Sequence, residues 1–272
     1  GLILLYFCFA EVGGEIATVD GKFYSGYEAV QINRKITKEF EGDLTDEKVN
    51  QIIEKYGLIP IRENANCQQI HIFINGFMSE EENNNINDWL NFINHYINSN
   101  DSIYLYKWKC GLDYTKWNNH FKINGINDVL KIIPFIFTKI NPSFNIAIPL
   151  FFISEWKNAR KNSLEYGIKL SKSLESFKKY KINIYAHSLG ASVVKELLLN
   201  LSDNINIENV YLFGGATNSE DYFKWLAACD NIQGKLFNFY TKNDLVLTRV
   251  YKVAELGETP IGLKPINIKN LM

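Results

Sequence analysis

Five short apolar runs, separated by longer segments with helical spacing, most limit the fold of this 272-residue chain. Each run is about five residues long and rich in β-branched or aromatic side chains, which is typical of buried parallel strands. This alternation predicts an α/β fold with a mainly parallel sheet flanked by helices, in which ligands bind at the carboxyl ends of the strands. The runs are Ile70–Ile74, Ile103–Trp108, Ile182–Ala186, Val210–Phe213 and Leu236–Tyr240.

Two helices are predicted around the third run, because apolar side chains recur at helical spacing before it and after it. The first set is Leu164, Ile168, Leu170, Leu174 and Phe177, and the second is Val193, Val194, Leu197, Leu198 and Leu201. A further short helix is predicted earlier in the chain. It begins at a cap formed by Thr45 and ends at Gly57.

Composition excludes several classes of protein. Hydrophobic residues make up 46% of the chain and charged residues 22%, which suits a large buried core and not a disordered chain. The net charge of −1 gives no overall field that would attract a nucleic acid, and none is expected as a partner. The cysteines are far apart and predict scattered thiols and not a disulfide scaffold; they are Cys8, Cys67, Cys110 and Cys229.

No metal or nucleotide site is predicted. The sequence has no His-x-x-x-His pair, no cysteine and histidine cluster at ligand spacing, and no glycine-rich phosphate loop. Any chemistry is therefore expected to need no cofactor.

The chain divides into an N-terminal segment, residues 1–68, which is partly helical, and an α/β domain, residues 69–272, with a cap insertion at about 110–155. The apolar run Leu2–Ala10 is about half the length of a membrane span. It leaves open the end of a signal peptide or membrane helix, a first strand, or a disordered end. The compartment stays open between membrane-associated, exported and cytoplasmic, and the oligomeric state is unknown.

The insertion is most apolar at residues 126–154, which are rich in Ile, Phe and Pro. Lysines interrupt it, and its apolar stretches are too short for a comfortable span. Two interpretations stay open: an apolar lid or hairpin at a membrane interface, and a helical cap that packs on the sheet without touching lipid. The nearby Trp108, Trp117, Trp156 and Phe151-Phe152 are expected to pack in the core or cap.

A nucleophile motif follows the third run, in the turn Ala186-His187-Ser188-Leu189-Gly190. A strand before a serine turn and a helix after it are the context of a nucleophile elbow. Such a tight bend needs small residues two places before and two places after the serine, and Ala186 and Gly190 satisfy this. Ser188 is therefore predicted as the nucleophile, with the N–H of Leu189 at the start of the helix as an oxyanion donor. The alternative is a serine that only caps the helix.

The neighbouring His187 is not expected to be the base, because adjacent residues in such a turn diverge. A packing or supporting role is predicted for it. The remaining histidines all precede Ser188 in the chain; they are His71, His95 and His120.

The second oxyanion donor is expected after the first run, at Asn75-Gly76-Phe77. Gly76 permits a close turn, and the N–H of Phe77 would point into the site. The alternative is an ordinary Asn-Gly turn.

A triad also needs a carboxylate after a strand beyond the nucleophile, in the chain order Ser, Asp, His. The last run ends just before Asp244, which is the predicted acid. The second choice is Asp221. It follows Asn218-Ser219-Glu220, which is more typical of the start of a helix.

These residues together resemble the α/β-hydrolase superfamily, and more narrowly the family of the transmembrane and coiled-coil domain-containing protein 4. The resemblance covers about residues 69 to 266. It implies an α/β-hydrolase fold, a Ser-Asp-His triad and lipase-like or esterase-like chemistry, often at membranes. The sequence segments that match this family are Ile74–Glu80, Trp89, Tyr104–Trp108, Trp156–Arg160 with Gly167 and Leu170, Ala186–Ala191, Val210–Ala216, Asn243–Leu247 with Tyr251, and Gly262–Ile266.

One departure from this family concerns the base. The family's histidine lies beyond the phrase Gly262–Ile266, and no histidine follows it here. The expected explanation is truncation at the C-terminus; the alternative is a hydrolase that has lost its base.

The sequence thus predicts a serine hydrolase that cleaves carboxylic esters, with a lipid ester as the favoured substrate and contact with a membrane surface left open. The alternatives are a catalytically silent hydrolase-fold module that binds a lipid or protein partner, and a thioesterase or transacylase.

Overall fold

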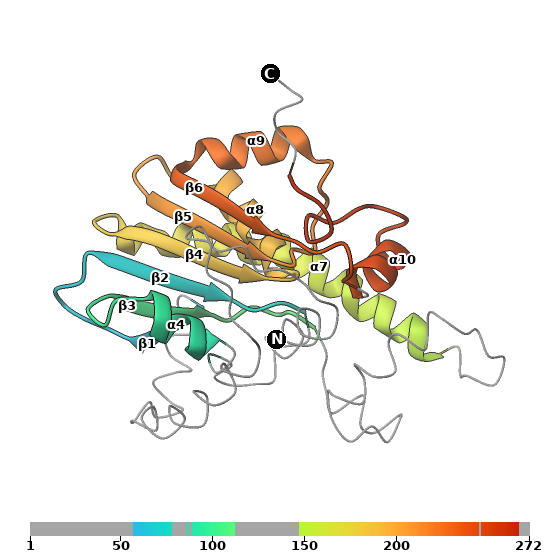
Figure 1. Ribbon diagram of the computed structural model, residues 1–272, viewed down its shortest axis with the longest axis horizontal. Helices are drawn as coiled ribbons and strands as arrows, with labels where there is room; N and C mark the ends of the chain where they lie inside the picture. The colour runs from blue at the N-terminus through green and yellow to red at the C-terminus, as the bar shows by residue number, and fades with distance from the viewer. Residues whose placement is uncertain (1–56, 78–85, 87–88, 112–146, 245, 267–272) are drawn as a thin grey trace.

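The computed structural model describes residues 57–77, 86, 89–111, 147–244 and 246–266 (Figure 1). Several expectations lie outside these residues. They are the apolar run Leu2–Ala10, the helix that begins at Thr45, most of the insertion, and the side chains of Cys8, Trp117 and His120.

The described residues form one six-stranded sheet in the order β1-β3-β2-β4-β5-β6. Four neighbouring pairs are parallel, and β1 is antiparallel to β3 at the edge, so the predicted α/β fold with a mainly parallel sheet is confirmed. Strand β1 precedes residue 69, so the sheet begins within the segment assigned above to the N-terminal part. The strands are β1 (Leu58–Arg62), β2 (Gln69–Ile74), β3 (Ser102–Tyr106), β4 (Lys181–His187), β5 (Asn206–Phe213) and β6 (Ile232–Phe239).

Helices lie on both faces of the sheet (Figure 1). One face carries α4 (Leu90–Tyr96), and the other carries α7 (Ala147–Ser173), α8 (Gly190–Leu199) and α9 (Tyr222–Asp230). Residues 147–154, the last part of the predicted insertion, form the start of α7. None of the described helices is both long enough and apolar enough to cross a membrane. The shorter elements are a 3-10 helix (Leu174–Phe177), a π-helix (Val246–Tyr251) and α10 (Lys252–Ala254).

Strand alternation divides the core between the two faces of the sheet. In β4, Ile184 and Ala186 join the cluster under α7 and α8, whereas Tyr185 joins the cluster under α4. Tyr185 also stacks between the rings of Phe73 in β2 and Tyr211 in β5, with centroid distances of 4.6 and 4.8 Å. The sheet is thus rigidly packed beneath the strand that leads to Ser188.

The predicted apolar face of α7 is partly wrong. Leu170 is fully buried, but Leu164 and Ile168 are each 38% exposed. The reason is that α7 packs on α8 through small residues: Ser163 is fully buried, and Gly167 lies against the backbone of α8. This packing turns the two larger apolar side chains toward the rim of the interface.

Gly167 permits the close contact between α7 and α8, and its replacement by alanine is expected to destabilise the protein. A Cβ atom there would lie 2.6 Å from both the Val193 carbonyl oxygen and the Glu196 Cβ. Overpacking outweighs the ~1 kcal/mol that alanine gains in helix propensity, so we expect a net loss of about 1–2 kcal/mol in urea unfolding. Lys172→Ala, at an exposed position of the same helix, is the control. Equal stability of both variants would contradict this account of the interface.

Candidate functional site

The site lies where the chain reverses its direction of progress across the sheet. Strand β2 lies between β3 and β4: the chain passes from β2 outward to β3 and then returns to β4 on the other side. Ligands in open α/β sheets bind at the carboxyl ends of the strands at such a switch point. The turns after β2 and β4, which contain Gly76 and Ser188, flank this point.

Ser188 occupies the turn between β4 and α8 in a strained backbone conformation. Its φ of 51° lies in the left-handed region, which side-chain-bearing residues rarely adopt. The predicted strand, turn and helix around this serine are confirmed. Its backbone N–H donates to the carbonyl oxygen of Phe213 at the end of β5 over 3.0 Å, so the strained turn is anchored to the neighbouring strand.

The turns at Ser188 and Gly76 touch each other, and only small residues fit between them. A Cβ atom at Gly76 would lie 2.6 Å from the Ser188 Cβ and 3.2 Å from its Oγ. A Cβ atom at Gly190 would lie 2.8 Å from the carbonyl oxygen of Ile74. Ala186 is fully buried beneath the turn. The structure therefore brings the predicted Asn75-Gly76-Phe77 loop directly against the serine turn.

The peptide unit between Ser188 and Leu189 is fixed by two hydrogen bonds. The Ser188 carbonyl oxygen accepts from the N–H groups of Ala191 (3.1 Å) and Ala216 (2.9 Å). Because a trans peptide is planar, its N–H, on Leu189, points away from both donors. Leu189 is the N-cap residue of α8. The first amides of a helix have no acceptor within the helix. The sequence did not predict the hydrogen bond from Ala216. The only local indication of a close contact is the run of small residues Gly214-Gly215-Ala216.

The Phe77 ring belongs to a line of aromatic contacts. It meets Trp156 of α7 edge-on at a centroid distance of 5.2 Å, and Trp156 meets Tyr251 of the π-helix at 5.9 Å. Trp156 is 3% exposed and donates through Nε1 to Glu255 Oε1, which fits the packing role predicted for it. These contacts join the loop after β2 to the segment that carries the predicted acid.

Asn75 is held by two tryptophans. Its Oδ1 accepts from Nε1 of Trp89 at 2.7 Å, and its carbonyl oxygen accepts from Nε1 of Trp108 at 2.9 Å. Trp108 is therefore a buried hydrogen-bond donor as well as a core residue. The Asn75 side chain thus fixes the loop and faces α4.

Asp244 lies at the same edge of the sheet, after β6. Its side chain is buried, Oδ1 accepts from the Leu247 N–H at 2.9 Å, and Oδ2 lies 3.9 Å from where a Gly214 Cβ would stand. Gly214 directly follows β5 and donates to the carbonyl oxygen of Phe239 at the end of β6. The ends of β4, β5 and β6 are therefore tied together, with Ser188 and Asp244 on the outer two.

Asp221 has a different role. It is the N-cap residue of α9, as its sequence context predicted, and its Oδ2 lies 2.7 Å from Nζ of Lys195 in α8. Hydrogen bonding to Lys195 and the positive charge of that lysine hold the pKa of Asp221 low, against the opposing effect of desolvation, which is the largest single influence. This pair is part of the packing of α9 on α8, so Asp244 is the better candidate acid.

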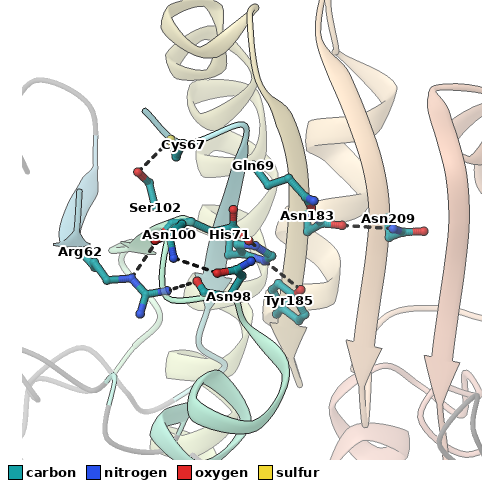
Figure 2. A network of polar contacts seen from close by, with 11 residues as sticks. Arg62, Cys67, Gln69, His71, Asn98, Asn100, Ser102, Asn183, Tyr185 and Asn209 are labelled. Atoms are coloured by element: carbon teal, nitrogen blue, oxygen red, sulfur yellow. Dashed lines mark hydrogen bonds and ion pairs between the residues drawn. The ribbon is translucent and has the colours of Figure 1, made fainter. Parts of the chain in front are cut away.

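The described histidines do not supply a base at Ser188. His71 lies near the start of β2, where Nδ1 is 3.0 Å from the Tyr185 hydroxyl and Nε2 is 3.2 Å from Asp101 Oδ2 (Figure 2). Its partner across the ladder is Asn183, five residues before the serine. His95 is exposed on α4 and contacts the Asn91 carbonyl oxygen. His120 lies outside the described residues.

His187 is adjacent to Ser188 but faces the α4 side of the sheet, since strand residues alternate and Tyr185, two places earlier, packs on that side. Desolvation by burial lowers the pKa of His187 to about 3. The ring is therefore neutral near neutral pH and a poor proton acceptor. These observations agree with the supporting role expected for His187.

The C-terminal part of the chain, residues 147–272, matches a family model described as a protein of unknown function (DUF726). A 90-residue stretch is 33% identical to an uncharacterized membrane protein of Schizosaccharomyces pombe. That match covers 32% of this chain and 15% of the yeast protein. No solved structure matches the chain.

Proposed function

We propose that this protein is a serine hydrolase of the α/β-hydrolase type that cleaves carboxylic esters, with Ser188 as the nucleophile. The observation that carries the proposal is the strained backbone of Ser188, at φ 51°, in a strand-turn-helix beside the switch point of the sheet. A serine that only caps a helix does not need this conformation, because an N-cap residue normally lies in the β region. Strain of this kind is typical of functional sites.

In the proposed reaction, the Ser188 hydroxyl loses its proton to a histidine base, and its Oγ attacks the acyl carbon of the ester. The N–H groups of Leu189 and Phe77 stabilise the oxyanion. The ester C–O bond then breaks, and the alcohol leaves with the proton from the base. Water hydrolyses the acyl-enzyme by the same route in reverse. Asp244 would orient the base, which is not one of the described histidines.

A lipid ester is the proposed substrate class. One observation supports it: the yeast relative is described as a membrane protein. The family resemblance described above also implies lipase-like or esterase-like chemistry, often at membranes. Contact with a membrane surface during turnover is part of this proposal.

The second candidate is a catalytically silent module of the same fold that binds a lipid or protein partner. It is favoured by one observation: none of His71, His95 and His187, the histidines that the structure describes, has its ring placed to serve Ser188. A thioesterase or transacylase would use the same residues as the esterase and differ only in the leaving group or acceptor.

Fluorophosphonate labelling of the full-length protein tests the proposal. We expect covalent labelling of the wild type, with a bond formed between Ser188 Oγ and phosphorus, and fluoride expelled. Ser188→Ala should lose more than about 99% of the labelling and of ester turnover, while its melting temperature stays within about 2 °C, because a half-buried hydroxyl contributes little to stability.

One control variant tests the specificity of the labelling. Ser202→Ala removes a hydroxyl distant from the proposed site and should leave labelling unchanged. No labelling of the folded, full-length wild type would contradict the hydrolase and favour the silent module.

A further inference from the structure

Arg160 of α7 has an unusual setting at the start of α8. Its guanidinium NH1 donates to Ser192 Oγ at 2.6 Å, and Ser192 lies in the first turn of α8, four residues after Ser188. A second, longer contact of 3.4 Å reaches Ser163 Oγ. Both serines are fully buried. The charge of Arg160 is thus directed at the helix turn whose first amide is the proposed oxyanion donor.

No carboxylate neutralises Arg160 at close range. Within the part of the chain that the structure describes, no carboxylate oxygen lies within 4 Å of its guanidinium. Asp221, one of the acidic groups in this region, is paired with Lys195 at 2.7 Å. Among the described residues, the guanidinium of Arg160 donates its hydrogen bonds to the hydroxyl groups of Ser192 and Ser163.

The position of this charge relative to α8 is unfavourable. A cation near the N-terminus of a helix is repelled by the positive end of the helix dipole. Arg160 also acts on the neighbouring pair in both directions: it lowers the pKa of Lys195, which disfavours the ammonium group, and it lowers the pKa of Asp221, which favours the carboxylate. The two serines do not need the guanidinium, because Ser163 Oγ lies 2.9 Å from Ser192 Oγ and also donates to the Arg160 carbonyl oxygen. The hydrogen bonds between the two serines therefore give no reason for a charge here.

We propose that Arg160 is a positioning residue for the proposed hydrolase reaction: it fixes the first turn of α8 through Ser192 and adds positive potential behind the Leu189 amide. An oxyanion that forms beside this amide is stabilised by a fixed, partly buried charge more strongly than by a solvated one. The inference rests on the proposed function. It adds a residue from α7 to a site whose other members follow strands of the sheet.

The experiment compares fluorophosphonate labelling rates of four full-length proteins: wild type, Arg160→Met, Arg160→Lys and Lys161→Met. Arg160→Met, which keeps the volume and loses the charge, should label about ten-fold more slowly, because the reaction passes through an anionic phosphoryl oxygen. The labelling rate of Arg160→Lys should lie within about three-fold of the wild-type rate, since lysine keeps the positive charge but lacks the planar guanidinium. Lys161→Met removes an exposed charge from the same helix and should change nothing.

Thermal melting gives the second measurement. Arg160→Met should melt within about 2 °C of the wild type, because the relieved repulsion from Lys195 and the helix dipole is offset by the lost attraction to Asp221. Labelling of Arg160→Met at the wild-type rate would overturn the inference and leave the proposed function standing. So would slow labelling accompanied by a lowered melting temperature that Arg160→Lys does not restore, since the role would then be structural. A wild-type protein that fails to label would instead overturn the proposed function, and the role of Arg160 with it.

Discussion

The protein is expected to lose about 4 kcal/mol of unfolding free energy from His187 alone as the pH falls from about 6.5 toward 3. Burial lowers the pKa of His187 to about 3 in the folded protein, whereas the unfolded chain has the ordinary value near 6.5. Between these values the unfolded chain binds the extra proton, so stability rises with pH. The full contribution is present above pH 6.5 and is lost progressively below it.

His71 acts in the same direction. Desolvation lowers its pKa, although the hydrogen bond and the charge of Asp101 oppose the effect. Urea unfolding at pH 7.5, 6.5, 5.5 and 4.5 measures the slope. His187→Gln, which cannot be protonated, should flatten it by about 1.4 kcal/mol per pH unit between pH 6 and 4. Parallel curves for His187→Gln and the wild type would mean that His187 is hydrated and protonated in the folded state.

Asp221→Ala is expected to cost about 3 kcal/mol of stability. The side chain of Lys195 is 1% exposed and pairs with Asp221, so removal of the carboxylate leaves a buried ammonium group without its counter-charge. Desolvation already lowers the pKa of Lys195, and the nearby charge of Arg160 lowers it further. Because Asp221 itself is 32% exposed, the loss should fall at the low end of the range for buried pairs.

A double-mutant cycle isolates this pair. Lys195→Met combined with Asp221→Ala should recover most of the stability that Asp221→Ala loses, because the uncompensated charge is gone and the methionine packs on Trp225. Glu220→Ala is the matched control: it breaks an exposed pair with Lys264 and should cost less than about 0.5 kcal/mol. If the double variant is no more stable than Asp221→Ala, the loss comes from the α9 N-cap and not from the charge of Lys195.

The sequence predicted the strands and helices whose formation depends on residues close together in the chain. Five of the six strands, the helix after Ser188 and the start of α9 at Asp221 follow from local periodicity and capping patterns. Strand β1 was missed because Pro60 interrupts a short apolar run, and proline is tolerated only on an edge such as this one. The exposure of Leu164 and Ile168 was missed because the partner surface of α7 is set by Gly167.

Some features of the candidate site were also predictable from local sequence, whereas others were not. The sequence by itself determined that Ser188 follows a strand and opens a helix, and that Gly76 and Asp244 follow other strands, because short-range pattern decides these features. Only the tertiary structure decided that β2 and β4 are neighbours and that Asp221 pairs with Lys195. It also decided that Ala216 contacts the serine turn and that Arg160 contacts the first turn of α8. Those contacts join residues far apart in the chain, and strand order and helix packing set them. No local sequence pattern predicts the order of the strands in the sheet.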